Sequence, residues 1–222
     1  RPPTLEQPWN LVIYTDEVTP GNPLATLNKK RFHAIYWSFL EFGVDALSRE
    51  EGWFCVTTEY SVLVAALHAG LSQVFVVVLK LFFSEGVNLA ITGMLLPCGD
   101  RLWAQVGGIL HDGGAHKSVW QSRGDGATKF CSLCKNIFVN ENNIIDEDGT
   151  NLLTCNVLKW TGLVAASSMD LRRNARYLAT QVDTMSPDAF IALQQPLGLT
   201  HHKHSLLLDT YLDAYLDPVA VY

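Results

Sequence analysis

An apolar run near the start of the chain decides the fold, and it reads Trp9-Asn10-Leu11-Val12-Ile13-Tyr14-Thr15-Asp16. Pro8 precedes the run, and the turn-forming stretch Thr19-Pro20-Gly21-Asn22-Pro23 follows it. Such boundaries predict a β-strand that ends at Asp16, with the carboxylate exposed at the strand end. Asp16 is therefore the first candidate site residue.

A second strand-like run ends in the same way. It extends from Leu102 to Leu110 and leads into His111-Asp112-Gly113-Gly114. If the two strands are neighbours in one sheet, Asp16 and Asp112 lie together at its edge. Paired carboxylates bind hard cations such as Mg²⁺ or Mn²⁺, which take oxygen ligands and leave positions open for a phosphate. The pair predicts a metal-dependent enzyme that acts on nucleic acid.

A cysteine pair follows the second acid, in the stretch Cys131-Ser132-Leu133-Cys134. Two thiolates at this spacing converge on one tetrahedral zinc ion, which needs two further ligands. Cys155 is the best third ligand, and His116 and the cluster His201-His202-Lys203-His204 are candidates for the fourth. A redox dithiol and a pair of simple core cysteines are the alternatives to a zinc site.

Composition limits the class of protein. The chain has 222 residues, of which 48% are apolar, so it can form one large domain or a domain with an insertion. Only 17% of the residues are charged and the net charge is −6, so any contact with DNA must use local basic patches. Such patches are Lys29-Lys30-Arg31 and Arg123 with Lys129 and Lys135. The odd cysteine count, the CxxC pair and the lack of a signal peptide favour a reducing compartment.

Hydrophobic periodicity predicts an order of elements along the chain. We expect strands at residues 9–16, 32–41 and 53–60, a helix from Ser61 as its N-cap to about Ser84, and an added strand at 87–96. A turn at 97–100 then leads into the strand that ends at Asp112. Two further helices are expected at about 169–182 and 186–194.

One stretch is almost as hydrophobic as a membrane span, but polar residues interrupt it. Residues 61–83 are largely apolar, but Lys80 and other polar residues interrupt them, and Gly70 weakens a single straight helix. A buried or broken helix is therefore expected there, and no membrane partner.

Three strands, a helix and a fourth strand, with acids at the ends of strands one and four, resemble the ribonuclease H-like fold. Two blocks of sequence make the resemblance sharper. Tyr14 to Pro23 resembles the first-acid motif of cut-and-paste transposases of the CACTA (EnSpm) and Plavaka type, in which an Asp precedes an Asn-Pro-like turn. His111 to Cys134 resembles their second-acid motif, in which an Asp precedes a Gly-containing stretch and a CxxC.

The resemblance implies an α/β fold with a ribonuclease H-like mixed sheet flanked by helices and a cysteine-bearing insertion. It also implies an Asp/Asp/Asp-or-Glu triad that holds two metal ions for attack on a phosphodiester, with Asp16 and Asp112 in the first two places. Glu17 is a weaker candidate because neighbouring strand residues point to opposite faces. The implied cofactors are Mg²⁺ or Mn²⁺ and a structural Zn²⁺. The implied partners are transposon-end and target DNA in the nucleus, and a homo-oligomer is compatible with the family.

The chain departs from the family's pattern in two places. In the family the third acid lies near a Met-His pair on a late helix, and no such pair occurs up to Tyr222, so we expect the third acid beyond it. Three acids near the end are available but not assigned, namely Asp209, Asp213 and Asp217. The family's CxxC commonly continues into a second Cys/His pair, whereas here Cys155 is followed by Lys159 where a His is expected.

These patterns predict two regions and one function. Residues 1–125 form the ribonuclease H-like core with the first two acids, and residues 126–222 form an insertion with the CxxC and helices. The function is metal-dependent DNA cleavage and strand transfer at transposon ends. The alternative is a non-catalytic, zinc-stabilised DNA- or protein-binding module derived from a transposase. A third hypothesis is an unrelated metal-dependent hydrolase that uses the histidine cluster.

Overall fold

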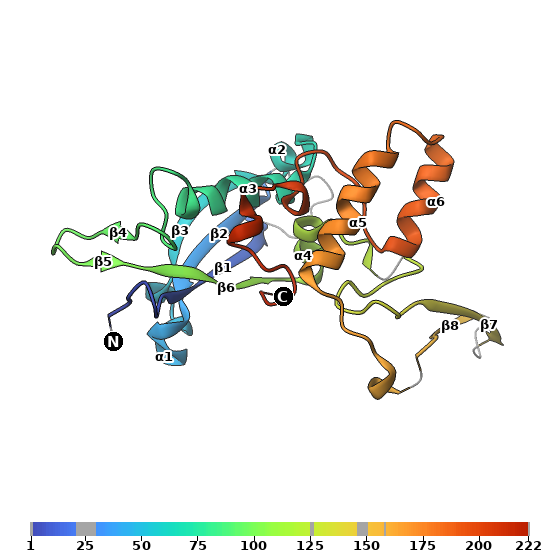
Figure 1. Ribbon diagram of the computed structural model, residues 1–222, viewed down its shortest axis with the longest axis horizontal. Coiled ribbons are helices and arrows are strands. Elements are labelled where there is room, and N and C mark those ends of the chain that lie inside the picture. The colour runs from blue at the N-terminus through green and yellow to red at the C-terminus, as the bar shows by residue number, and fades with distance from the viewer. Residues whose placement is uncertain (1, 21–29, 125–126, 146–150, 158, 222) are drawn as a thin grey trace. The chain divides into compact units, whose positions relative to one another are not determined.

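The computed structural model describes residues 2–20, 30–124, 127–145, 151–157 and 159–221, with the backbone alone described for 140–145 and 151–155 (Figure 1). The chain forms two compact units. The first contains Arg1–Trp120 together with His204–Tyr222, and the second contains Gln121–Lys203. The observed division therefore differs from the expected one, since the last segment of the chain belongs to the same unit as the two acids.

A four-stranded mixed sheet lies at the centre of the first unit, with the strand order β3-β2-β1-β6. Its strands are β1 (Trp9–Val18), β2 (Phe32–Phe39), β3 (Phe54–Tyr60) and β6 (Ala104–His111). The neighbours β1, β2 and β3 are antiparallel, and β6 is parallel to β1. This confirms the expected α/β class, a mixed sheet with helices against it.

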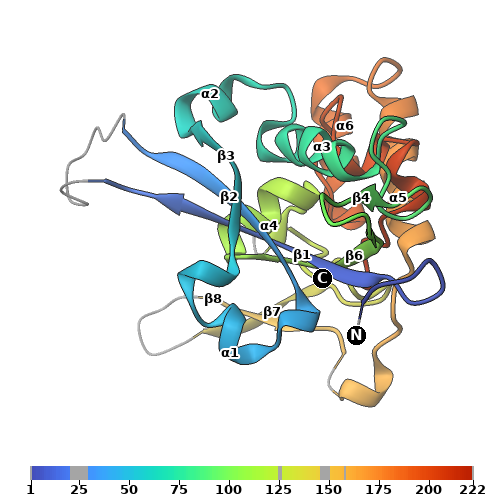
Figure 2. The same cartoon turned by 90° about the vertical axis from the view of Figure 1, so that its left-hand side faces the viewer.

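Helices lie on both sides of this sheet (Figure 2). They are α1 (Val44–Leu47), α2 (Ser61–Ala66), α3 (Gly70–Phe83) and α4 (Gly113–Trp120). Helices α2, α3 and α4 lie on one side, and the short α1 lies on the other. Two 3₁₀ turns flank α1, at Leu40–Phe42 and Glu50–Gly52, and two more lie in the last segment of the chain, at Leu206–Leu208 and Leu212–Ala214.

The alternation of side chains along β1 explains why the larger helices cover one face. Leu11, Ile13 and Thr15 are each at most 1% exposed, because they share the face that the helical layer covers. The side chains of Tyr14 and Asp16 point to the opposite face, as the period of two in a strand requires. The candidate acid therefore lies on the face opposite Leu11 and Ile13, and on its own face Val12 is also buried, at 1% exposure.

The predicted helix over residues 61–84 is broken into α2 and α3. Gly70 begins α3 with a φ of +52°, a left-handed conformation that glycine adopts without a steric penalty. The expected N-cap at Ser61 is wrong, because Tyr60 is the N-cap residue of α2. The Ser61 hydroxyl instead donates a hydrogen bond to Glu17 Oε1 over 2.6 Å.

The strand expected at residues 87–96 is wrong for most of its length. Only β4 (Met94–Leu95) is extended, and it pairs with β5 (Arg101–Leu102) in a separate small hairpin. Asn88 forms a turn in place of the strand, since its Oδ1 accepts from the backbone amides of Ala90 and Ile91 at 3.1 and 3.0 Å. Such local side-chain bonds compete with strand pairing.

The second unit contains a helical pair and a hairpin. Its elements are β7 (Val139–Ile145), β8 (Asn151–Cys155), α5 (Ser168–Gln181), α6 (Pro187–Leu197) and a 3₁₀ turn at Trp160–Gly162. The two late helices expected from the sequence are confirmed. Ser167 and Asp170 form a capping box at the start of α5, and Ser186 caps α6. In the described parts of both units, no helix is long and apolar enough to cross a membrane.

The adjacent glycines of β6 provide a test of the β1–β6 packing. A Cβ at Gly107 would lie 2.5 Å from Asn10 Cβ, whereas a Cβ at Gly108 would lie 3.8 Å from Val12 Cγ2. Gly107→Ala should therefore lower the free energy of unfolding by about 1 to 3 kcal/mol through overpacking, measured by urea denaturation. Gly108→Ala is the matched control and should cost clearly less. Equal unfolding midpoints for the two variants would contradict this packing.

Candidate functional site

The pairing of β1 with β6 brings the two predicted acids to one edge of the sheet. The parallel register runs up to the pair Thr15↔His111, and the next residue on each chain segment is Asp16 and Asp112 respectively. Both residues are exposed. Neighbouring strands lie about 4.8 Å apart. Two carboxylates at adjacent positions of such strands can therefore bind the same cation.

Asp16 does not end its strand, which corrects the expectation drawn from the turn residues that follow. β1 continues to Val18 because β2 pairs with it along its full second half, up to Val18↔Phe32. Asp16 therefore lies within a strand that is paired on the β2 side. Its backbone is held by the sheet rather than by a loop.

Tyr14 lies two residues before Asp16 and shares its face of the sheet. The two side chains form a hydrogen bond in which the Tyr14 hydroxyl donates to the Asp16 carboxylate. Burial raises the pKa of Tyr14, and the negative charges of Asp16 and, more weakly, Asp112 raise it further. The phenol therefore stays protonated. The charges of both carboxylates influence its pKa.

Asp112 has a structural role at the start of α4. Its Oδ1 accepts a hydrogen bond from the Ala115 amide over 2.6 Å, and its backbone carbonyl accepts from His116 over 2.8 Å. These are the contacts of a helix N-cap residue. The amides at the helix start favour the charged carboxylate and hold its orientation.

Glu17 lies on the opposite face from Asp16, as the alternation of the strand predicts. Its Oε2 forms a salt bridge with Arg31 at 3.3 Å. The hydrogen bond from Ser61 is the main cause that lowers the pKa of Glu17, and Arg31 adds to it. This carboxylate is engaged by its own partners and does not join the pair formed by Asp16 and Asp112.

The donor set suits a hard cation but is incomplete among the described residues. Two carboxylates supply oxygen ligands of the kind that Mg²⁺ and Mn²⁺ prefer. Within the described ranges, no group of three or more His, Cys, Asp or Glu residues is placed to hold a metal ion. Asp209 forms a salt bridge with Lys80 at 2.6 Å, and Asp217 accepts from the amides of Val219 and Ala220. These contacts give Asp209 and Asp217 structural roles in the last segment.

The predicted cysteine pair lies in an irregular segment of the second unit. Lys135 donates its amide to the Val164 carbonyl, and Ala166 donates its amide to Leu133, each over 2.8 Å. Burial lowers the pKa of Lys129, and the nearby Cys131, Asp170 and Cys134 partly oppose this shift. Both cysteines are therefore close enough to influence the pKa of the buried Lys129 side chain.

Among the described side chains, none of the other proposed zinc ligands is shown beside this pair. The side chain of Cys155 lies outside the described side chains, and His116 belongs to the first unit. His201 is half-buried against Phe190, at 5.9 Å between ring centroids. The zinc site therefore stays a prediction.

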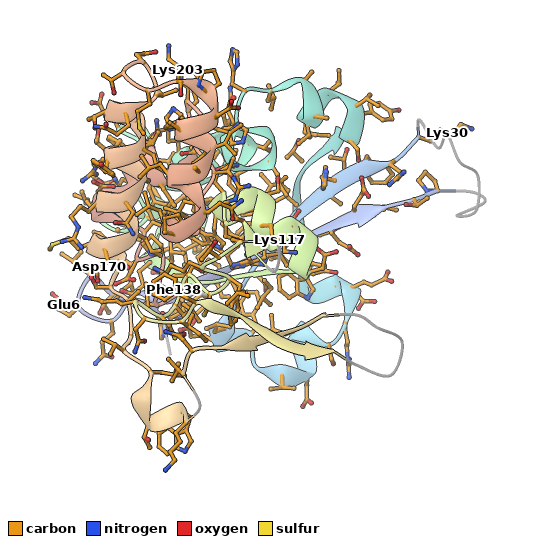
Figure 3. The ribbon with its side chains drawn as sticks, turned by 90° about the vertical axis from the view of Figure 1, so that its right-hand side faces the viewer. Glu6, Lys30, Lys117, Phe138, Asp170 and Lys203 are labelled. Atoms are coloured by element: carbon orange, nitrogen blue, oxygen red, sulfur yellow. The ribbon has the colours of Figure 1, made fainter. Side chains whose placement is uncertain are left out.

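Asp170 organises the polar contacts beside the cysteines. It lies in the first turn of α5 (Figure 3) and forms salt bridges with Lys135 at 2.8 Å and with Arg173 at 3.0 Å. The hydrogen bond from Lys135, followed by those from Ser167, lowers the pKa of Asp170 far below its ordinary value. Two of the basic residues expected to contact DNA, Lys129 and Lys135, thus have acidic or thiol neighbours within their own unit.

An aromatic cavity beside the acids was not anticipated from the sequence. It has a volume of about 580 Å³ and lies on the same sheet face as Asp16 and Asp112, lined by Tyr14, Tyr36, Leu47, Glu50, Trp53 and Leu110. The period of two that places Tyr14 with Asp16 was the available signal. The contribution of residues 47–53 depends on how the chain around α1 folds back, and no periodicity shows that.

In comparisons with known family models, with curated proteins and with solved structures, nothing matches this chain. The resemblance to transposases therefore rests on the residues themselves.

Two histidines close to Asp112 give the first unit a pH dependence. His111 Nε2 accepts a hydrogen bond from Trp120 over 3.1 Å, and the His111 and His116 rings lie 4.7 Å apart. Burial lowers the pKa of His116 to about 4, with smaller contributions from His111 and Lys117, and burial also lowers the pKa of His111. Both rings are therefore neutral in the folded protein at neutral pH.

Stability should fall as the pH falls from about 6.5, the ordinary histidine value, towards 4, because the unfolded chain binds protons that the folded chain excludes. The urea midpoint should therefore drop between pH 7.5 and pH 4.5. His116→Gln should reduce the size of this drop, whereas His68→Gln, at an exposed position of the same unit, should behave like the parent chain. An unchanged pH dependence in His116→Gln would contradict the assignment.

Proposed function

We propose that this chain contributes the first two acids of a ribonuclease H-like catalytic core, in a DDE-type transposase that cleaves and joins DNA phosphodiesters. One observation carries the proposal. The parallel register of β1 and β6 puts Asp16 and Asp112 next to each other, with both carboxylates exposed at the same sheet edge. Exposed carboxylates on neighbouring chain segments are suited to a divalent cation and a phosphate.

The strand order supports the same proposal. The sequence resemblance implies three strands, a helix and a fourth strand, with acids on strands one and four, and the sheet order β3-β2-β1-β6 is compatible with that layout. The helical segment expected between the third strand and the strand before Asp112 is present as α2 and α3. These agreements concern topology, and the chemistry rests on the acids.

In the proposed mechanism the chain's own residues orient the carboxylates. The Tyr14 hydroxyl holds Asp16, and the amides at the start of α4 hold Asp112, so both acids are preorganised before substrate binds. Mg²⁺ or Mn²⁺ bound there would supply Lewis acidity and an activated water or 3′-hydroxyl. A third acid is required by the family pattern and is not assigned.

A second candidate function is a non-catalytic, zinc-stabilised DNA- or protein-binding module. It is favoured by the CxxC spacing of Cys131 and Cys134, two half-buried cysteines in one segment, because two thiolates at that spacing can bind one tetrahedral zinc ion. Metal binding by the acids distinguishes the two functions, because only the catalytic function requires Asp16 and Asp112 to bind a metal ion.

Manganese binding tests the acids directly. The 222-residue chain should bind Mn²⁺, measured by the loss of the free-ion electron paramagnetic resonance signal, and Asp16→Asn or Asp112→Asn should weaken the affinity about tenfold or more, because each removes a charged oxygen ligand. Asp45→Asn, at an exposed position of α1, is the matched control and should bind like the parent chain. Unaltered binding in both site variants would exclude the metal site and favour the second function.

The same variants separate the structural role of Asp112 from its proposed chemical role. Asn caps a helix about as well as Asp, so Asp112→Asn should retain the unfolding midpoint while it loses metal affinity. Asp112→Ala should weaken the metal affinity and also lower the unfolding midpoint, with a stability cost of about 1 kcal/mol.

Zinc content tests the cysteine pair. The purified, reduced chain should contain about one zinc ion per molecule, and Cys131→Ser should lower both the zinc content and the stability of the second unit, because a tetrahedral site needs every thiolate. Cys98→Ser, at an exposed cysteine of the first unit, is the matched control. If the parent chain contains no zinc and Cys131→Ser leaves its stability unchanged, the zinc hypothesis is excluded. A redox dithiol or a pair of core cysteines would then remain as explanations.

A further inference from the structure

The aromatic cavity next to the acids has the properties of a site for a flat, apolar ring. Tyr14 and Tyr36 lie 6.2 Å apart with an interplanar angle of 21°, and Trp53 lies 5.9 Å from Tyr14 at 58°. Three aromatic rings therefore converge on one cavity from two neighbouring strands and the segment before β3. The cavity volume of about 580 Å³ falls in the range of small-molecule sites.

The walls of the cavity are held in place by contacts of their own. The Trp53 ring donates from Nε1 to the Leu47 carbonyl over 2.9 Å, which fixes the ring at the side of the cavity. Tyr14 and Tyr36 are opposite each other in the β1–β2 register, so the sheet fixes their spacing. Rings that are fixed before binding lose little conformational entropy when a ligand stacks on them.

The charges around the cavity select the kind of ligand. Glu50 is exposed and is the one charged side chain among the described lining residues, so the cavity repels a phosphate and can accept hydrogen bonds from an amino group. Nucleobases combine a flat π-surface with exocyclic amino groups, and carboxylates accept from the amino group of cytosine in known recognition. A base, rather than a phosphate, therefore fits the lining.

Two residues that line the cavity, Tyr14 and Leu110, each lie two positions before one of the acids. The ring of Tyr14 lines the cavity, and its hydroxyl bonds to Asp16. Leu110 lines the same cavity and is the register neighbour of Tyr14, two residues before Asp112. A nucleotide whose phosphate lies at the carboxylates would therefore have a base-sized cavity immediately beside it on the same sheet face.

We propose that this cavity, lined by Tyr14, Tyr36, Trp53 and Glu50, binds the base of an unpaired nucleotide next to the reacting phosphate. The inference rests on the proposed function, and it specifies the substrate as DNA with a base out of the duplex stack. Removal of a base from the stack costs free energy, and stacking on aromatic side chains offsets this cost. Single-stranded or splayed DNA ends are therefore preferred over an intact duplex.

The experiment uses the 222-residue chain with a short single-stranded oligonucleotide that carries 2-aminopurine, in buffer without divalent metal ions. Stacking in the cavity should quench the 2-aminopurine fluorescence, and titration gives the affinity. Tyr36→Leu should weaken binding about tenfold, because stacking of one base is lost, while Tyr36→Phe should retain it. Glu50→Gln should reduce the preference for a base with an amino group over thymine.

Trp160→Leu is the matched control, because Trp160 is 83% exposed and belongs to the second unit. Its loss should leave both the quenching and the affinity unchanged. Circular dichroism of each variant verifies that the fold is retained.

The outcomes separate this inference from the proposed function. Equal affinity of Tyr36→Leu and the parent chain, or equal quenching by a fully paired duplex, would overturn the base site even if Mn²⁺ binding depends on Asp16 and Asp112. Quenching that requires Tyr36 would support the base site. If Mn²⁺ affinity were nevertheless unchanged in both Asp16→Asn and Asp112→Asn, the catalytic assignment would be wrong and the base site would stand.

Discussion

The parallel pairing of β1 with β6 is the interaction on which the first unit depends. It joins strands that are far apart in the sequence, and it is made close by Gly107, whose missing side chain leaves room for Asn10. Because the side-chain period of a strand is two, a slip of one residue would turn the acids to the covered face and the core residues outward. One register therefore determines the core and the candidate site together.

The two faces of β1 have different roles, and Asp112 connects them. The covered face carries Thr15 opposite His111, whose ring bonds to Trp120 of α4. The other face carries Asp16 and the aromatic cavity. Asp112 follows β6 and caps α4, so the residue that begins a packed helix is also the proposed ligand. A substitution there can affect stability and chemistry by separate mechanisms.

Asp170 lies at the centre of a set of polar contacts in the second unit. Asp170 caps α5 and forms salt bridges with Lys135 and Arg173, and the cysteine segment lies beside residues 164–166 through backbone bonds. Lys129, one of the basic residues expected to contact DNA, is 7% exposed, whereas the Lys135 side chain is 48% exposed and forms a salt bridge with Asp170.

Local pattern alone determined the strands at 9–16, 32–41 and 53–60, the late helices and the two acids that follow apolar runs, because periodicity and turn residues act over short distances. It misplaced the end of β1, the cap of α2 and the strand at 87–96, where partner strands or the Asn88 side chain compete with local preference. Only the tertiary structure decided that β1 and β6 are neighbours and that Tyr36 and Trp53 join Tyr14 around a cavity. Those contacts link distant segments, and their register depends on packing between elements rather than on any one stretch of sequence.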